Sequence, residues 1–415
     1  MSLENLSGHA VLRAAAVKAV FKALAGEGQT SSPTTRLVGG TVRNALLGEP
    51  VHDFDMATVL TPDIVTLKAE AAGLKVVPTG IEHGTVTVVA NGKPVEVTTL
   101  RSDVETDGRH ATVRFTEDWE EDAGRRDFTM NAIYCDPDGI LFDPLGGRDD
   151  LAARLVRFIG DPEDRIREDY LRILRFFRFF AYYGHGRPDA GGLKACVRLK
   201  SGMAQLSAER IWSELKRLLE ARDPARAMLW MRTTEVLQAV LPESWGIDAI
   251  HPLIAAEQAE GWLPDPILRL EAILPPRAER IEELAHRLKL AKAETARLTD
   301  WAGVDRVAAD ISDGALAERL YRDGAQPLRD RFALALAKAL GEEDADAAEQ
   351  LRSRIAFIDG WTKPVFPLAG KDLLDLGHEP GPAMGELLAA LEEKWIESGF
   401  AVSRKILLKE AKRSS

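Results

Sequence analysis

The alternation of hydrophobic and polar positions changes character near residue 149. Before it, short runs rich in Val, Ile and Thr are separated by Gly, Pro or Asn-Gly, a pattern that predicts strands. Asn91-Gly92 lies between two such runs and favours a tight hairpin, and Thr61-Pro62 is typical of a helix start. The pattern predicts a small α/β region with a partly antiparallel sheet, whose strands are 36–38, 53–57, 74–77, 85–90, 95–100 and 132–136.

From about Asp149 onward the hydrophobic positions repeat with the period of a helix. Tyr170, Ile173, Leu174 and Phe177 stand at i, i+3, i+4 and i+7, which predicts one buried helix face. The fold class is therefore α+β, a mixed sheet followed by an all-helical remainder. The same spacing marks 206–219, 281–298, 332–340 and 351–358, and residues 1–25 are also expected to form an amphipathic helix.

Length and charge refine this picture. A chain of 415 residues is too long for one core, so two to four domains are expected. The net charge is −11, but residues 151–240 hold 17 Lys and Arg against 11 Asp and Glu, a local net of +6 that leaves −17 for the rest. A basic middle between acidic flanks suits a nucleic acid lying along one face. A solvated helical face explains the same charges equally well.

Cysteine usage and hydropathy bear on location. Cys135 and Cys196 are far apart and form neither a disulfide framework nor a zinc pattern, which favours a reducing cytoplasm. No apolar run approaches ~18 residues, so no membrane span is expected. Arg13, Lys18 and Lys22 in the N-terminal segment leave an organelle presequence as an alternative.

The segment 37–55 carries the clearest chemistry. Gly39-Gly40 ends an apolar run and leaves a backbone that a phosphate can approach closely, with Arg43 three residues further on. Asp53 and Asp55 point to the same face of an extended segment. Two such carboxylates repel each other unless a cation lies between them, and Mg²⁺ binds through one or two carboxylates plus substrate phosphates. The segment predicts a nucleoside triphosphate held by Mg²⁺, with Asp53 and Asp55 as its ligands.

Glu96 is the natural third carboxylate. Val95 and Val97 would face the core, so Glu96 faces the other way, toward the same side of a shared sheet as the two aspartates if the strands are neighbours. An exposed strand carboxylate is the equally good alternative. The chemistry would be attack of a hydroxyl on the α-phosphate, with pyrophosphate leaving.

A second cluster is Arg125-Arg126-Asp127, followed by Asn131. Guanidinium groups bind phosphate oxygens in a bidentate manner, and Asp127 and Asn131 suit ribose hydroxyls. A helix start capped by Asp127 is the alternative.

A third cluster contains Asp169 and Arg172, which lie three apart and are expected on one helical face. A surface ion pair is the ordinary interpretation. The functional one is base recognition, because a carboxylate accepts from an exocyclic amino group and a guanidinium donates to a ring nitrogen or carbonyl. Cytosine and adenine match this pair, whereas uracil and guanine would leave a buried carboxylate facing an acceptor.

Taken together, the motifs resemble those of the class II tRNA nucleotidyltransferases, the CCA-adding enzymes. The similarity covers roughly residues 36–215, in the order typical of that family. The matching segments are Gly39–Arg43 with Asp53 and Asp55, Arg125–Ala132, Phe142–Leu151, Glu168–Arg172 with Arg175 and Arg178, and Leu206–Glu214.

The resemblance implies a nucleotidyltransferase head (1–148), a neck with base recognition (149–240), a helical body (241–360) and a tail that binds tRNA (361–415). It implies catalysis by Asp53, Asp55 and Glu96 with Mg²⁺, and a nucleotide site of Gly39, Gly40, Arg43, Arg125, Arg126, Asp127, Asn131, Asp169, Arg172, Arg175 and Arg178. A flexible loop with Arg109 and His110 would switch addition from C to A. CTP, ATP and the tRNA acceptor arm are the implied partners, and no DNA or membrane is expected.

Other functions remain open at this point. A bacterial poly(A) polymerase shares the head and neck motifs, but such enzymes tend to be strongly basic and this chain has a pI near 5.4. Addition of CC alone or of A alone is a further alternative. A noncatalytic RNA-binding scaffold would not need adjacent carboxylates, and Gly39-Gly40 lacks the G-x-G-x-x-G spacing of a dinucleotide-binding fold.

Overall fold

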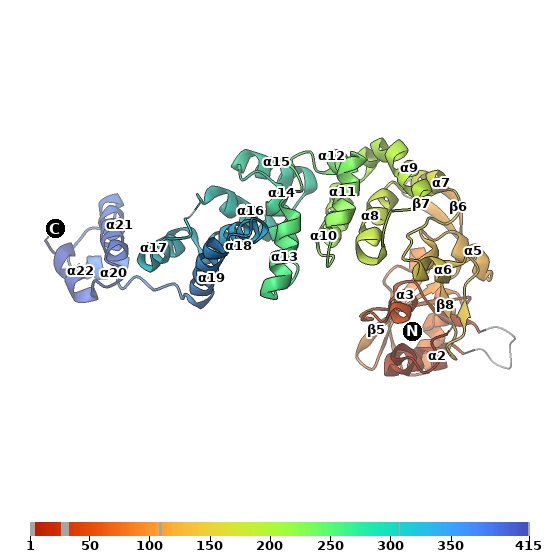
Figure 1. Ribbon diagram of the computed structural model, residues 1–415. Helices are drawn as coiled ribbons and strands as arrows, with labels where there is room; N and C mark the ends of the chain where they lie inside the picture. The colour runs from red at the N-terminus through yellow and green to blue at the C-terminus, as the bar shows by residue number, and fades with distance from the viewer. Residues whose placement is uncertain (1–4, 26–32, 108–109, 307, 414–415) are drawn as a thin grey trace. The chain divides into compact units, whose positions relative to one another are not determined.

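The structure is a computed structural model that describes residues 5–25, 33–107, 110–306 and 308–413. The chain forms two compact units, Met1–Pro242 and Glu243–Ser415 (Figure 1). The α+β class is confirmed, because a mixed sheet is followed by helices alone. The four predicted domains stay a prediction.

A seven-stranded sheet forms the centre of the first unit. Its strand order is β3-β4-β5-β2-β1-β8-β9, and only β2 and β5 run parallel among these neighbouring pairs. Asn91 and Gly92 both adopt positive φ in the turn between β4 and β5, as the hairpin prediction requires. The strands are β1 (Thr35–Val38), β2 (Phe54–Thr58), β3 (Lys75–Val77), β4 (Thr85–Ala90), β5 (Lys93–Thr99), β8 (Tyr134–Cys135) and β9 (Leu141–Phe142).

One face of this sheet is covered and the other carries polar groups. Val95 and Val97 of β5 are buried, and α2 and α4 pack against β4 and β5. Glu96 alternates to the opposite face, where its register partner on β2 is Asp55. The two strands are therefore neighbours, which is the condition on which the placement of Glu96 beside the aspartates depends.

Helices complete the first unit. In Figure 1, α8, α10 and α11 form one group, in which α10 and α11 both pack on α8. The helices are α1 (Ala10–Arg13), α2 (Ala15–Leu24), α3 (Gly40–Leu47), α4 (Pro62–Ala71), α5 (Trp119–Gly124), α6 (Gly147–Ala152), α7 (Pro162–Glu168), α8 (Leu171–Tyr183), α9 (Ala190–Leu199), α10 (Ala208–Leu219), α11 (Ala225–Thr233) and α12 (Val236–Val240), with 3₁₀ turns η1 (Ile81–His83), η2 (Thr129–Asn131) and η3 (Lys200–Gln205).

A cluster of phenylalanines joins α8 to the sheet region. The ring of Phe128 lies 4.9 Å from the rings of both Phe158 and Phe179, measured between centroids, and Phe158 stacks on Phe176 at 5.4 Å. All four side chains are buried. Because aromatic side chains bury large apolar areas, this cluster fixes α8 beside residues 125–131.

Several predicted elements differ in the structure. The segment expected to be a flexible loop is a two-stranded antiparallel sheet of β6 (Arg101–Asp107) and β7 (His110–Phe115). Arg109 lies outside the described residues, and so does the side chain of His110. The predicted strand 132–136 is shortened to β8, because Ala132 ends the turn η2.

Two predicted helices are interrupted. The periodic segment 281–298 is divided between α15 and α16, because Lys289 adopts a left-handed conformation with φ of 51°. The N-terminal segment breaks at Ala14, whose ψ of 128° is not helical. Neither break carries a Gly or Pro, so hydrophobic spacing alone predicted continuous helices.

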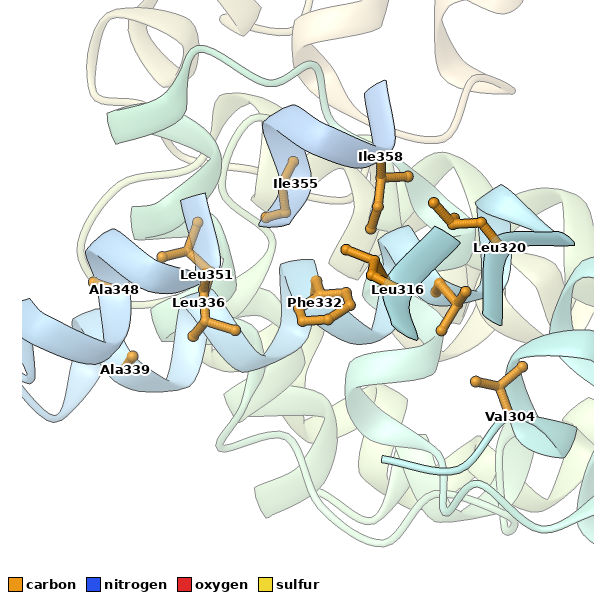
Figure 2. Packing of buried hydrophobic residues seen from close by; sticks show 11 residues of the cluster. Val304, Leu316, Leu320, Phe332, Leu336, Ala339, Ala348, Leu351, Ile355 and Ile358 are labelled. Carbon is orange, nitrogen blue, oxygen red and sulfur yellow. The ribbon is translucent and has the colours of Figure 1, made fainter. Parts of the chain in front are cut away.

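The second unit is entirely helical among its described residues, and its core lies around α18. Figure 2 shows side chains from α17, α18 and α19 directed into a common core, with Phe332 among them. The C-terminal helices enclose a separate smaller core around Trp395. The helices are α13 (Ile250–Glu260), α14 (Pro266–Ile273), α15 (Ala278–Leu288), α16 (Lys292–Gly303), α17 (Asp313–Asp323), α18 (Ala325–Gly341), α19 (Ala345–Gly360), α20 (Gly370–Asp375), α21 (Pro382–Glu397) and α22 (Arg404–Ala411).

None of the described helices is long and apolar enough to cross a membrane.

A buried acid lies in this second unit. Glu271 is 1% exposed, and neither of its carboxyl oxygens accepts a hydrogen bond from the described residues. The nearest cation, the Nε of Arg297, is 3.9 Å away and already pairs with Asp330 and Asp265. Burial, and then the charge of Asp330, raise the pKa of Glu271 well above its ordinary value.

Replacing Glu271 with glutamine is expected to stabilise the protein at pH 8. A carboxyl whose pKa is raised by folding costs stability above its unfolded pKa of about 4.3, and the cost grows as the pH rises toward the folded pKa. We expect Glu271→Gln to raise the free energy of unfolding by about 1–3 kcal/mol at pH 8 and to change it little at pH 4. Urea unfolding of the intact protein at both pH values measures this, with the exposed Glu279→Gln as control. A loss of stability at pH 8 would contradict it.

Candidate functional site

A pocket of about 500 Å³ opens in the first unit, where five parts of the chain meet. These are the turn from β1 into α3, strand β2, the segment that follows α5, helix α8 with Asp169 before it, and the start of α10. Most of the predicted site residues line it, together with three that were not predicted, Leu171, Phe179 and Arg210. The predicted residues at the pocket are Gly39, Gly40, Arg43, Asp55, Arg126, Asp127, Asn131, Asp169, Arg172 and Arg175.

Some predicted residues do not line this pocket. Asp53 is exposed just before β2, and Glu96 is exposed on β5. Arg125 and Arg178 lie behind the pocket wall, each held by a buried carboxylate described below. The pocket therefore separates the predicted residues into an inner group and a supporting group.

The glycine pair shapes the floor of the pocket. Gly39 has φ of 64° and ψ of −129°, a conformation that non-glycine residues rarely adopt. A Cβ at Gly39 would lie 3.8 Å from Nη1 of Arg126 and 4.0 Å from Oδ2 of Asp55. Absence of side chains here leaves room for a ligand between a guanidinium and a carboxylate, beside the N-terminus of α3.

Replacing Gly39 with alanine is therefore expected to weaken nucleoside triphosphate binding at least tenfold, because the new methyl group occupies ligand space. The backbone penalty adds about 1–3 kcal/mol of destabilisation. Gly73→Ala is a matched control, because Gly73 also has a positive φ of 76° but a Cβ there would meet no atom within 4 Å. Unfolding and nucleotide titration should show both variants destabilised and only Gly39→Ala impaired in binding. Equal affinities would contradict the role of Gly39.

A threonine of α3 holds the backbone of the segment that carries the two carboxylates. The Thr41 hydroxyl donates to the Asp53 carbonyl (3.0 Å) and accepts from the Asp55 backbone N–H (2.8 Å), so α3 holds the start of β2 in place. Burial, and then the charges of Glu96 and Asp53, raise the pKa of Asp55 to about 6, although Arg126 opposes this. A cation beside Asp55 would remove the repulsion that raises this pKa.

The donor set suits Mg²⁺ in part. Among the described residues, no three His, Cys, Asp or Glu side chains are arranged closely enough to hold an ion. Two carboxylates two residues apart, with phosphates completing the shell, are nevertheless what Mg²⁺ ordinarily uses. The predicted ligands Asp53 and Asp55 therefore fit the ion, and Glu96 flanks Asp55 without forming a three-carboxylate cage.

Arg43 is the cation whose charge is least neutralised at the pocket. Its Nε and Nη2 donate to Asn44 Oδ1 (3.2 and 3.0 Å), its Nη2 also donates to the Tyr183 hydroxyl (2.7 Å), and its Nη1 donates to Asn131. These described hydrogen-bond acceptors are all neutral. Burial lowers the pKa of Arg43, which reflects the cost of a buried charge without a contacting carboxylate.

The pair Arg125 and Arg126 is organised by a carboxylate that sequence reasoning missed. Asp122 accepts from Arg125 Nη2 (2.7 Å), Arg126 Nη2 (3.0 Å) and the Tyr134 hydroxyl (2.7 Å). The two guanidinium groups hold the pKa of Asp122 down at about 2 despite its burial. The three Asp and Glu residues at the start of α5 gave no signal that one of them turns inward.

Asp127 and Asn131 are engaged within the protein. Asp127 accepts from Arg175 Nε (2.9 Å) and from Asn131 Nδ2 (2.9 Å), and it caps no helix. Arg175, and then Asn131, lower the pKa of Asp127 against the effect of burial. Their predicted contact with ribose hydroxyls stays a prediction. Arg178 is held by the buried Glu214 (2.6 Å) and does not reach the pocket.

Asp169 and Arg172 do not share a helical face, which corrects the prediction. Asp169 ends α7 with an extended backbone (φ −154°, ψ 106°), and α8 begins only at Leu171. Asp169 accepts from Arg210 Nη2 (2.7 Å) and from the Leu171 N–H (3.1 Å), while Arg172 pairs with Glu168 and donates to the Arg165 carbonyl (2.9 Å). Both side chains still line the same pocket.

Comparison with known proteins places this geometry in a family. Residues 35–157 match the poly A polymerase head domain, and residues 192–246 match the probable RNA and SrmB-binding site of polymerase A. The mitochondrial CCA tRNA nucleotidyltransferase 1 of Homo sapiens is 34% identical over 91% of this chain and 86% of its own length. The CCA-adding enzyme of Geobacillus stearothermophilus is 34% identical over 85% of this chain and 86% of its own length. The crystal structure of the Bacillus stearothermophilus CCA-adding enzyme in complex with CTP superposes with a TM-score of 0.69, at 32% identity, over 92% of this chain and 93% of that one. The chain belongs to the CCA tRNA nucleotidyltransferase family.

Proposed function

We propose that this protein adds the sequence CCA to the 3′ end of tRNA, using CTP and ATP and no nucleic-acid template. The 3′-hydroxyl of the tRNA attacks the α-phosphate of the nucleotide, and pyrophosphate leaves. The observation that carries the proposal is a single pocket lined by Gly39, Arg43 and Asp55 at one side and by Asp169 and Arg172 at the other. Relatives over most of the chain are named for this activity.

The side of the pocket that carries Gly39, Arg43 and Asp55, here called the phosphate side, is proposed to hold the triphosphate. Arg43 brings a buried positive charge whose described hydrogen-bond acceptors are neutral, so phosphate oxygens would supply the missing negative charge. Arg126 adds a second guanidinium whose orientation Asp122 and Tyr134 fix. Gly39 and Gly40 let the ligand reach the backbone beside the N-terminus of α3.

Asp53 and Asp55 are proposed to hold Mg²⁺. When bound, the ion would lower the charge on the α-phosphate and favour the deprotonated form of the attacking hydroxyl. Thr41 keeps the two residues in register, and Glu96 is proposed to reinforce the negative field at Asp55 from the neighbouring strand.

The side of the pocket that carries Asp169 and Arg172, here called the base side, is proposed to select cytosine and adenine. Asp169 would accept from the exocyclic amino group, and Arg172 would donate to the adjacent ring acceptor. In the structure each side chain already has a partner, Arg210 for Asp169 and Glu168 for Arg172. Binding of a correct base must therefore replace or share these ion pairs, whereas an incorrect base would break them without compensation.

The acceptor arm of tRNA is the proposed macromolecular partner. The basic stretch 151–240 overlaps the matched RNA-binding segment 192–246, and recognition of a helical arm rests mainly on shape and phosphate contacts.

A reducing compartment, the cytoplasm, is the proposed location. Cys135 and Cys196 are both buried and unpaired, as such a compartment favours.

The test is to incubate the purified protein with Mg²⁺ and a tRNA transcript that ends at the discriminator base. CTP, ATP or both are supplied, and products are resolved to single nucleotides. Three additions that stop at CCA support the proposal, with a single-stranded oligonucleotide of the same 3′ sequence as a control that should be extended poorly. A long A ladder without C indicates a poly(A) polymerase, and products that stop after CC or need a CC end indicate a partial activity.

A further inference from the structure

We propose that Tyr183 is a positioning residue for the nucleotide triphosphate, which it serves by orienting the guanidinium of Arg43. This inference rests on the proposed function, because it assigns Arg43 to the phosphates. Tyr183 lies at the C-terminal end of α8, outside every motif that the sequence comparison singled out. It does not line the pocket, so it would act through Arg43.

The contact between the two side chains has two components. The Tyr183 hydroxyl lies 2.7 Å from Nη2 of Arg43, and the centroid of its ring lies 4.1 Å from Cζ of the same guanidinium. Phe179, one turn earlier on α8, places its ring 5.2 Å from that Cζ. A hydrogen bond fixes the rotation of the guanidinium plane, while an aromatic face under a desolvated cation offsets part of its burial cost.

The remaining contacts of Arg43 come from elsewhere. Asn44 lies on α3 and Asn131 on η2, whereas Tyr183 belongs to the helix that also carries Arg172. Four of the five guanidinium hydrogens are used by these described acceptors, which leaves one on Nη1 beside the pocket. Each acceptor can orient the group, but only Tyr183 does so from α8.

A closed set of polar contacts supports the assignment. Arg175 of α8 pairs with Asp127, which accepts from Asn131, which accepts from Arg43, which donates to Tyr183 at the far end of the same helix. Loss of the Tyr183 hydroxyl would free Nη2 to reorient toward Asn44 alone, 3.0 Å away. The N–H donors of the Arg43 guanidinium would then point in a different direction relative to the phosphates.

The test compares Tyr183→Phe and Tyr183→Leu with the control Tyr182→Phe, whose hydroxyl donates to the Arg217 carbonyl on α10. KM and kcat are measured for CTP and ATP, and equilibrium binding is measured for CTP and CMP. Because the lost hydrogen bond is made by a charged group, we expect Tyr183→Phe to raise KM about tenfold for both nucleotides, which corresponds to about 1.4 kcal/mol. The affinity for CMP, the kcat, and the preference for CTP and ATP over UTP and GTP should change little. Tyr183→Leu should bind CTP more weakly than Tyr183→Phe.

Unchanged KM in both Tyr183 variants would overturn the proposal. So would a loss confined to one of the two nucleotides, a matching loss of CMP affinity, or relaxed base selection, each of which points to the base side or to general damage. Because CTP binding is measured without turnover, failure of the proposal is distinguishable from failure of the proposed function, which would appear as wild-type protein that adds no nucleotide.

Discussion

Replacing Asp55 with asparagine is expected to lower kcat for nucleotide addition at least 10³-fold. A bound metal ion contributes several kcal/mol of transition-state stabilisation, and each 1.36 kcal/mol is tenfold in rate. Asparagine keeps the shape of the side chain but is a much weaker metal ligand. The rate of CTP addition to tRNA at saturating Mg²⁺ measures this, with the exposed Asp63→Asn as the matched control.

The same variant should be more stable than the wild type when EDTA removes metal ions. Folding raises the pKa of Asp55 to about 6, mainly by burial and by Glu96. Such a group costs stability above its unfolded pKa of about 3.9, and the cost reaches its full size once the pH exceeds 6. At pH 8 we expect a gain of up to about 3 kcal/mol, and at pH 4 almost none. An active Asp55→Asn protein would show that Asp55 is not the metal ligand. A variant less stable in EDTA would show that the Asp55 carboxylate does not destabilise the metal-free fold.

The second large effect is expected at the base side of the pocket. Alanine at Asp169 or at Arg172 should reduce the preference for CTP and ATP over UTP and GTP about 10²-fold. A site that hydrogen-bonds its substrate rejects mismatched analogues by roughly 10⁴, and removal of one member of the pair forfeits about half of that free energy. Single-turnover rates with each of the four nucleotides measure the preference.

Arg198→Ala is the matched control for these variants, because Arg198 is an exposed arginine of the same unit that pairs with Glu163. It should keep the wild-type preference. Arg210→Ala gives a further comparison, since it removes the partner of Asp169 and leaves Asp169 itself in place. If Asp169→Ala and Arg172→Ala select nucleotides as the wild type does, the base-recognition hypothesis is wrong.

The arrangement of the strands around Asp55 could be predicted from sequence because its signals are local. The glycine pair, the two aspartates and the alternation around Glu96 each depend on a few consecutive residues and on the period of a strand. The seven-stranded sheet brings Asp55 and Glu96 into register as that alternation requires. The hydrophobic spacing likewise located most helices, because burial of one face sets their period.

Two of the residues that sequence reasoning missed, Tyr183 and Arg210, are long-range partners. Each contacts a residue that the motifs contain, but Tyr183 lies 140 positions from Arg43 and Arg210 lies 41 from Asp169. No spacing rule connects such pairs. The break between α7 and α8 at Asp169 was missed because no Gly or Pro marks it. The hairpin of β6 and β7 was interpreted as a flexible loop because its residues resemble the loop that CCA-adding enzymes carry.

The contacts of Arg175 and Tyr183 have a mechanical consequence for α8. The helix is fastened to the sheet region near both of its ends, at Asp127 through Arg175 and at Arg43 through Tyr183. A helix held by two contacts cannot rotate about one of them unless the other contact breaks. Cytosine and adenine differ in size by one ring. On the proposed assignment of the pocket, we expect side-chain rotation at the N-terminal end of α8 to accommodate that difference, while the triphosphate keeps one position.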